Sequence, residues 1–208
     1  MFLVIEGIDG SGKTTLVNSL AEALNNEGIS TATLGAWDSE HGPAFRKLLT
    51  ETELPGVAQL MVACAARTLI QPEIEQLLGT HEVVIMDRYF LSTLAYQTYR
   101  ATPEVEAFVK HQVITHLGMN MWRNPDLTLL LDAFPEDALA RVSSRGDKDV
   151  LERKGEALME HCIGVFGDEL ASENSVVTNI RVVPARNNEQ ELVLKKALGY
   201  VKEMLDKA

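Results

Sequence analysis

The sequence predicts an α/β fold in which helices cover both faces of a doubly wound parallel sheet. Segments with the spacing of strands and segments with the spacing of helices alternate along the chain. The strand-like segments, such as residues 2–6, 82–87 and 127–134, are continuous apolar runs and do not alternate with polar residues. Parallel strands that are buried on both faces have this pattern. In such a sheet, ligands bind beyond the carboxyl ends of the strands.

The individual elements follow in order along the chain. The expected strands are FLVIE (2–6), STATL (30–34), EVVIMD (82–87), LTLLLDAF (127–134) and a last strand within SVVTNIRVV (175–183). The expected long helices cover residues 14–28, 58–78 and 188–207, of which the last is amphipathic. Gly28 suits a helix C-cap, and Pro72 predicts a kink or break in the second helix.

Residues 1–208 are expected to form one domain. The chain has 208 residues and shows no linker, repeat or low-complexity tract. A chain of this length can bury one sizeable core. The polar segment SSRGDKDVLERKGE (143–156) lies between a strand–helix unit and the last strand, and it is the best candidate for a mobile flap.

Composition excludes several classes of function. Lys and Arg total 19 and Asp and Glu total 30, so the net charge is −11, and we expect no binding to nucleic acid. We expect no membrane segment, because no apolar stretch approaches the roughly 20 residues that cross a bilayer. The first apolar run is short and broken by Glu6, which argues against a signal peptide. Cys64 and Cys162 form no CxxC motif or disulfide framework, which favours reduced thiols in a cytoplasmic protein.

The stretch EGIDGSGKTTL (6–16) carries the first functional signal. It fits the pattern G-x-x-x-x-G-K-[ST], a phosphate-binding loop, with Gly7, Gly12, Lys13 and Thr14. Glycines let the backbone turn so that successive N–H groups point at phosphate oxygens, and the positive end of the following helix adds to this attraction. Lys13 can then reach the β- and γ-phosphates of a nucleotide, and the Thr14 hydroxyl can ligate Mg²⁺.

Asp87 carries a second signal at the end of the apolar run 82–87. It is expected at the same edge of the sheet as the loop, where it would hold Mg²⁺ directly or through water. A helix N-cap paired with Arg88 is the alternative role for this acid, and the two roles are compatible. The chain has no N-K-x-D segment, which weakens a GTPase interpretation, and its histidines have no paired ligand spacing that would build a metal site.

Several segments together resemble the thymidylate kinase family, and the resemblance spans nearly the whole chain. They are EGIDGSGKTTL (6–16), CAAR (64–67), MDRYFLSTLAYQ (86–97), NPDLTLLLD (124–132) and the R-x-x-x-R-G segment (141–146). The resemblance implies ATP-dependent phosphorylation of a deoxynucleoside monophosphate, chiefly dTMP, to the diphosphate. It also implies a five-stranded parallel sheet of the P-loop NTPase type, a lid over about residues 141–156 and a homodimer packed through helices.

The same resemblance assigns residues to the phosphoryl donor. Lys13, Asp9, Arg88, Arg145 and Arg153 are the implied catalytic residues, with the two lid arginines supplying positive charge around the moving group. Thr14 and Asp87 are the implied Mg²⁺ ligands. The implied ATP-binding residues are Gly7, Asp9, Gly10, Ser11, Gly12, Lys13, Thr14, Thr15, Arg141 and Arg145.

The acceptor site is assigned in the same way. Arg88 matches the arginine that grips the acceptor phosphate, which suits a fork-shaped donor that stays charged. Asp9 matches an acid near the sugar 3′-hydroxyl or Mg²⁺, although a turn role is also open. Tyr96 matches a tyrosine against the sugar. The residues implied to face the base are Arg67, Thr93, Gln97 and, from the loop after the second strand, Trp37.

Some positions depart from the family pattern. The family usually has an arginine in the loop GAWDSEHGPAF (35–45), where this chain has Asp38 or a neighbour, and Arg46 or Lys47 is a candidate substitute. Ala63 replaces the aromatic residue that stacks on the base, and Trp37 is a candidate to fill that space. One branch of the family has an arginine where this chain has Gly10. Val150 likewise replaces a lid arginine.

These departures leave the substrate open. The first hypothesis is a kinase for dTMP or a 5-substituted analogue. The second is a kinase for another deoxynucleoside or nucleoside monophosphate, motivated by Ala63 and the 35–45 loop. The third is a non-catalytic nucleotide-binding switch, motivated by the same acidic loop and by the few basic residues in the lid.

Overall fold

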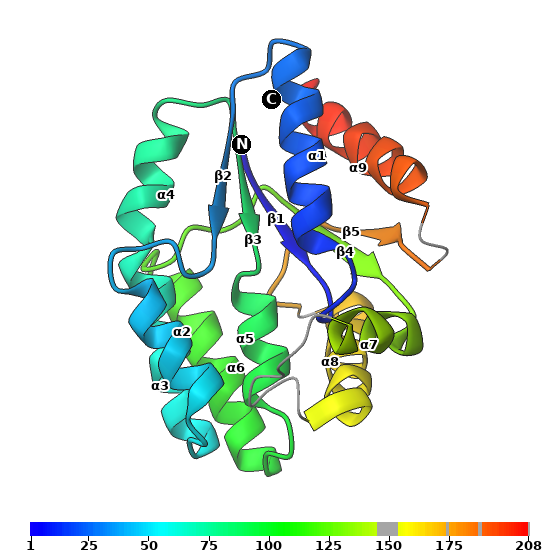
Figure 1. The fold of residues 1–208 in the computed structure, drawn as a ribbon. Helices are drawn as coiled ribbons and strands as arrows, with labels where there is room; N and C mark the ends of the chain where they lie inside the picture. The colour runs from blue at the N-terminus through cyan, green and yellow to red at the C-terminus, as the bar shows by residue number, and fades with distance from the viewer. Residues whose placement is uncertain (145–153, 174, 187–188, 208) are drawn as a thin grey trace.

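The computed structural model describes residues 1–144, 154–173, 175–186 and 189–207. Its centre is a five-stranded parallel sheet in the order β2-β3-β1-β4-β5 (Figure 1). The strands are β1 (Phe2–Glu6), β2 (Thr31–Gly35), β3 (Val83–Asp87), β4 (Leu127–Asp132) and β5 (Ile180–Pro184). The predicted fold class is confirmed.

Helices flank the sheet on both faces in the described part of the chain. They are α1 (Lys13–Asn26), α2 (Gly42–Glu51), α3 (Gly56–Leu69), α4 (Gln71–Leu78), α5 (Phe90–Gln97), α6 (Pro103–Gly118), α7 (Pro135–Ser143), α8 (Gly155–Ala171) and α9 (Gln190–Leu205). The helix predicted over residues 58–78 is broken at Ile70, and Pro72 stands in the first turn of α4.

Alternate residues of the central strand β1 point into two separate hydrophobic cores, one on each face of the sheet. Leu3 and Ile5 of β1 belong to the core under α1 and α9, whereas Phe2 and Val4 belong to the core on the opposite face. Each of these four side chains is at most 1% exposed. Because both faces of β1 are buried, the strand needs apolar residues at every position, which explains its continuous apolar run.

The strand register brings the functional segments to one edge. Asp87 at the end of β3 pairs with Ile5 of β1 and with Gly35 of β2, so the three strands end at nearly the same level. Strands β2 and β3 lie on one side of β1, and β4 and β5 lie on the other. The connection from β3 to β4 therefore crosses β1, and the loop after β1 lies beside the point where the direction of the strand order changes. This point is where doubly wound sheets bind ligands.

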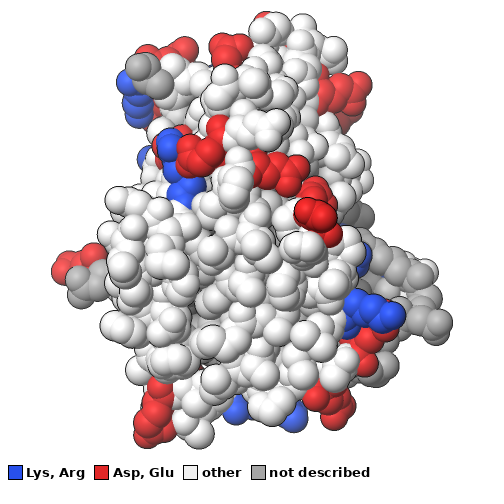
Figure 2. Space-filling view, turned by 90° about the vertical axis from the view of Figure 1, so that its left-hand side faces the viewer, with Lys and Arg blue, Asp and Glu red and all other residues white. Residues whose placement is uncertain are grey.

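The side of the molecule that carries α2, α3 and α4 has a wide area without charged side chains, as Figure 2 shows. Exposed apolar residues of α3 are Val57, Met61 and Leu69. Across the described ranges of the chain, no helix is both long and apolar enough to span a bilayer.

Candidate active site

The loop between β1 and α1 turns at glycines that take conformations unusual for other residues. Gly7, Gly10 and Gly12 have φ angles of 149°, 78° and 98°. Gly10 also lies tightly against α7, because a Cβ atom there would stand 2.2 Å from the carbonyl oxygen of Ala138. A side chain at position 10 would therefore push α7 away from the loop.

Lys13, the first residue of α1, folds back over the loop. Its Nζ donates a 2.6 Å hydrogen bond to the carbonyl oxygen of Ile8, and its side chain is buried. Burial lowers the pKa of Lys13 to about 8, and Arg88 acts in the same direction, while the charges of Asp9 and Asp87 oppose this shift. The ammonium group is thus held among the charged groups of the site.

Thr14 and Asp87 join the loop to the end of β3. The Thr14 hydroxyl donates a 2.7 Å hydrogen bond to Oδ2 of Asp87. The other carboxylate oxygen, Oδ1, is buried and has no hydrogen-bond partner among the described residues. A hydroxyl and a carboxylate with a free oxygen side by side are ligands that suit Mg²⁺. These residues line one pocket together with Asp9, Lys13 and Arg88.

Arg88, which follows β3, ties the loop to α5. Its Nη2 donates to the Asp9 carboxylate in a short ion pair, and its Nη1 donates to the Gly7 carbonyl (3.2 Å) and the Ser92 hydroxyl (3.1 Å). The guanidinium also lies 5.1 Å from the centre of the Tyr96 ring. Burial works against the charged form, but Asp9, Tyr96 and other neighbours raise the pKa of Arg88 overall.

Asp9 is the shared partner in this cluster. Its second oxygen accepts a 2.7 Å hydrogen bond from the Tyr96 hydroxyl. Burial raises the pKa of Asp9, but the charges of Arg88 and Lys13 outweigh burial and bring the pKa to about 2. The loop's acid therefore stays ionised between two cations.

Glu6 is a site residue that sequence reasoning did not identify. It is fully buried at the end of β1, and its Oε1 accepts hydrogen bonds from the backbone N–H groups of Tyr89 (2.8 Å) and Ser92 (3.0 Å). Its Oε2 accepts a hydrogen bond from the Ser92 hydroxyl. The only signal in the sequence is an acid that ends an otherwise apolar strand, directly before the loop.

The predicted base-facing residues come from three elements. Arg67 of α3 is buried, donates to the Ala36 carbonyl at 3.3 Å and lies 5.6 Å from the centre of the Trp37 ring. Nε of Arg67 and the Thr93 hydroxyl are buried and make no hydrogen bond within the described ranges. Gln97 is buried on α5. Burial lowers the pKa of Arg67, and the charge of Glu6 is the strongest influence in the opposite direction.

The atypical 35–45 loop is arranged by its own side chains. The Asp38 carboxylate accepts a 2.5 Å hydrogen bond from the backbone N–H of Gly35, so this acid closes a turn within its own loop. Arg46 and Lys47 are exposed on α2, and Lys47 pairs with Glu51 at 3.8 Å. Ala63 is buried on α3.

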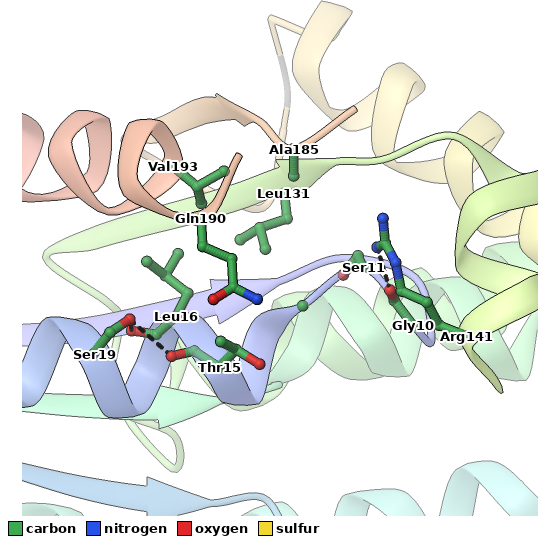
Figure 3. A pocket seen from close by; sticks show the side chains of 11 residues that line it. Gly10, Ser11, Thr15, Leu16, Ser19, Leu131, Arg141, Ala185, Gln190 and Val193 are labelled. Atoms are coloured by element: carbon green, nitrogen blue, oxygen red, sulfur yellow. Dashed lines mark hydrogen bonds between the residues drawn. The ribbon is translucent and has the colours of Figure 1, made fainter. Parts of the chain in front are cut away.

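A second pocket lies on the other side of the loop (Figure 3). Arg141 of α7 borders it and donates a 2.8 Å hydrogen bond to the Gly10 carbonyl. The remaining lining residues are Gly10, Ser11, Gly12, Thr15, Leu16, Ser19, Leu131, Ala185, Gln190 and Val193. Figure 3 shows the Gln190 side chain reaching from α9 toward α1. Ala185, Gln190 and Val193 carry no motif, and only the fold brings them to the loop. Arg145 and Arg153, the predicted lid residues, lie outside the described residues.

The strand order and the loop between β1 and α1 place the protein among the P-loop nucleotide-binding proteins. More specifically, the chain belongs to the thymidylate kinase family, whose model matches residues 5–193.

Individual relatives agree with the family match. The chain is 34% identical over 168 residues to a thymidylate kinase of Chlorobium phaeobacteroides, covering 74% of this chain and 75% of the relative. It is 36% identical over 157 residues to a thymidylate kinase of Carboxydothermus hydrogenoformans, covering 74% and 75%. A thymidylate kinase of Prochlorococcus marinus (strain NATL1A) is 28% identical over 221 residues, covering 98% and 97%.

Replacing Gly10 by alanine tests the contact between the loop and α7. We expect Gly10→Ala to destabilise the fold by more than about 2 kcal/mol and to weaken ATP binding, because the new methyl group meets the Ala138 carbonyl in a left-handed backbone. Urea unfolding and calorimetric titration with ATP measure both effects. Gly167→Ala in α8 is the control, since a Cβ atom there meets nothing within 4 Å. Equal stability of the two variants would contradict the tight contact.

The Asp9–Arg88 pair predicts a pH dependence of stability. Because the pKa of Asp9 is lowered from 3.8 to about 2, this residue stabilises the fold above its unfolded pKa and ceases to do so as the pH falls through about 2. We expect Asp9→Asn to unfold at lower urea concentration than wild type at pH 7. The difference between the two urea midpoints should become smaller from about pH 4 downward. A difference that stays constant over this range would show that the carboxylate charge contributes nothing to stability.

Proposed function

We propose that this protein transfers the γ-phosphoryl group of ATP to dTMP, which yields dTDP and ADP. The observation that carries this proposal is the position of Arg88 beside the phosphate loop. Its guanidinium hydrogen-bonds to both Gly7 and Asp9 of the loop, so a second phosphate-binding group adjoins the first. A loop for a donor phosphate next to an arginine for an acceptor phosphate is the arrangement that phosphoryl transfer between two nucleotides requires.

The loop side of the site suits ATP. Loop backbone groups and Lys13 would hold the phosphates, and the pocket bordered by Arg141, Thr15 and Gln190 would hold the adenosine. Arg141 lies within hydrogen-bonding distance of the loop backbone at Gly10, so it would stand between the phosphates and the base. Ser11 and Gly12 line the same pocket.

Thr14 and Asp87 would hold the Mg²⁺ ion of the nucleotide. The support is the free Oδ1 of Asp87 beside the Thr14 hydroxyl. When bound, Mg²⁺ neutralises and orients the β- and γ-phosphates. Asp87 is the described carboxylate that hydrogen-bonds to Thr14, and a site of one carboxylate and one hydroxyl suits an ion that takes its remaining ligands from phosphate and water.

The Arg88 side of the site suits a deoxynucleoside monophosphate. Arg88 would bind the acceptor phosphate, Asp9 would accept a hydrogen bond from the sugar and Tyr96 would pack against it. Arg67, Thr93 and Gln97 would face the base, because Arg67 and Thr93 have buried polar atoms that lack partners in the described structure. Unpaired polar atoms that receive a matching ligand discriminate strongly against ligands that cannot pair with them.

The reaction needs no general base from histidine. Phosphoryl transfer through a loose transition state depends mainly on positioning and on positive charge around the moving group. In this proposal Lys13 and the lid residues Arg145 and Arg153 supply that charge.

A related acceptor is the second candidate, and Ala63 favours it. This buried methyl group stands where the family places an aromatic ring, and the Arg67 guanidinium lies 5.6 Å from the centre of the Trp37 ring. A base with a larger 5-substituent than thymine, or a different base, would occupy the space that a phenyl ring leaves.

A panel of monophosphates tests the proposal. ADP formation is measured with ATP, Mg²⁺ and each of dTMP, 5-hydroxymethyl-dUMP, dUMP, dCMP and dGMP. We expect the highest kcat/KM with dTMP. Turnover of another monophosphate without turnover of dTMP would replace the acceptor. Tight ATP binding without ADP formation from any of them would favour a non-catalytic switch. Lys13→Ala provides the background rate.

Arg88→Ala tests the division of the site into donor and acceptor halves. We expect KM for the monophosphate to rise by about 100-fold or more, because a buried charged contact is lost, while KM for ATP changes by less than about threefold. Arg181→Ala removes an exposed arginine of β5 and serves as the control. Equal losses for both substrates would refute the assignment.

We also propose that the enzyme is a cytoplasmic homodimer. The free, buried thiols of Cys64 and Cys162 suit a reducing compartment. Val57, Met61 and Leu69 are 44–45% exposed on α3, and α3 belongs to the side of the molecule that has the wide uncharged area (Figure 2). A second copy of the chain would cover such an apolar helix face.

Met61→Asp tests the dimer. Sedimentation equilibrium should give twice the chain mass of 22.9 kDa for wild type and a shift toward the monomer for Met61→Asp, because a charge would be buried between the copies. Leu192→Asp, at a position 57% exposed on α9, is the matched control and should remain dimeric. A monomeric wild type at micromolar concentration would exclude this interface.

A further inference from the structure

The Ser92 hydroxyl lies between the side chains of Glu6 and Arg88 and forms a hydrogen bond with each of them. It donates its single hydrogen to Oε2 of Glu6 and accepts a 3.1 Å hydrogen bond from Nη1 of Arg88. A carboxylate only accepts and a guanidinium only donates, so the direction of both bonds is fixed. Ser92 is 5% exposed, so water does not compete effectively for either bond.

Glu6 also fixes the backbone around Arg88. Its Oε1 accepts the N–H groups of Tyr89 and Ser92, which belong to the unpaired first turn of α5. Arg88 itself has a φ angle of 68°, a conformation that costs a non-glycine residue free energy unless its surroundings enforce it. The buried carboxylate therefore holds the chain on the C-terminal side of Arg88, while Ser92 holds the end of its side chain.

These contacts decide which edge of the guanidinium remains available. Both N–H groups of Nη1 are used, one by the Gly7 carbonyl and one by Ser92, and one N–H group of Nη2 is used by Asp9. The N–H of Nε and the second N–H of Nη2 make no hydrogen bond within the described residues. Nε and Nη2 border one edge of the guanidinium, so their unused N–H groups are the ones left to bind the oxygens of a phosphate.

We propose that Glu6 and Ser92 are positioning residues, which hold the Arg88 guanidinium so that its Nε–Nη2 edge meets the acceptor phosphate. This inference rests on the proposed function, since it concerns how the monophosphate is recognised. It assigns no contact with the nucleotide to either residue. The proposal predicts a selective effect. Substitution of Glu6 or Ser92 should weaken recognition of the phosphate and leave recognition of the nucleoside intact.

The test compares the affinity for dTMP with the affinity for thymidine in the absence of ATP, by calorimetric titration. For Ser92→Ala, we expect the preference for dTMP over thymidine to fall by about tenfold, because Arg88 loses a fixed hydrogen bond, with thymidine affinity unchanged within about twofold. A purely structural role would weaken both ligands together. Thr98→Val is the matched control, since Thr98 is a buried hydroxyl residue at the opposite end of α5 that bonds to Leu94 and His161.

Glu6→Gln provides a second, isosteric variant if Ser92→Ala does not fold. Its amide oxygen can still accept the two backbone N–H groups, but its amide nitrogen cannot accept the Ser92 hydrogen. The same selective loss of dTMP affinity is expected. An unchanged preference in the variants that fold, or an equal loss for both ligands, overturns the inference.

A wrong assignment of the acceptor would be visible in the wild type and not only in the variants. If wild type does not bind dTMP more tightly than thymidine, the proposed acceptor is wrong. The pair is then tested with the monophosphate that the substrate panel identifies and with its parent nucleoside.

Discussion

The balance of buried charge at the ends of β1 and β3 is the constraint on which the site depends. Lys13, Arg67 and the end of Arg88 are largely buried there, and each removal of a charge from water costs several kcal/mol unless other groups compensate it. Asp9 pairs with Arg88, and Glu6 acts on Arg67 and Arg88 through space. The acids of this set therefore offset part of the cost of burying the cations.

The sheet supplies the rigid frame for these charges. The register that pairs Asp87 with Ile5 sets the end of β3 beside the phosphate loop, and Glu6 then anchors the first turn of α5. Because α5 also carries Tyr96, Thr93 and Gln97, one buried carboxylate indirectly orients the residues proposed to face the sugar and the base. Positioning by strands and a capped helix is more exact than positioning by loops alone.

The fold was predictable because its signals are local and periodic, whereas parts of the site depend on tertiary contacts. Apolar strands and the glycine pattern need only neighbouring residues to be interpreted. Glu6 was missed because its role depends on α5, which is more than 80 positions away in the chain. Gln190 was missed for the same reason. Asp38 stands where the family usually has an arginine, and its carboxylate closes a turn at Gly35, a contact that the residue type alone does not predict.

The tight contact at Gly10 bears on where the catalytic positive charge arises. A branch of the family has an arginine at this position, but here the Ala138 carbonyl stands 2.2 Å from the place of a Cβ atom. Any side chain at position 10 would have to displace α7, so this backbone arrangement excludes that arginine for a steric reason. The described cations Lys13, Arg67 and Arg88 lie beside three acids, Glu6, Asp9 and Asp87, and Arg141 adds one more cation at the loop. Two bound nucleotides add further negative charge, which these residues cannot offset. In our proposal Mg²⁺ and the arginines at positions 145 and 153 supply the additional positive charge. In the sequence, Arg145 follows the end of α7 by two residues.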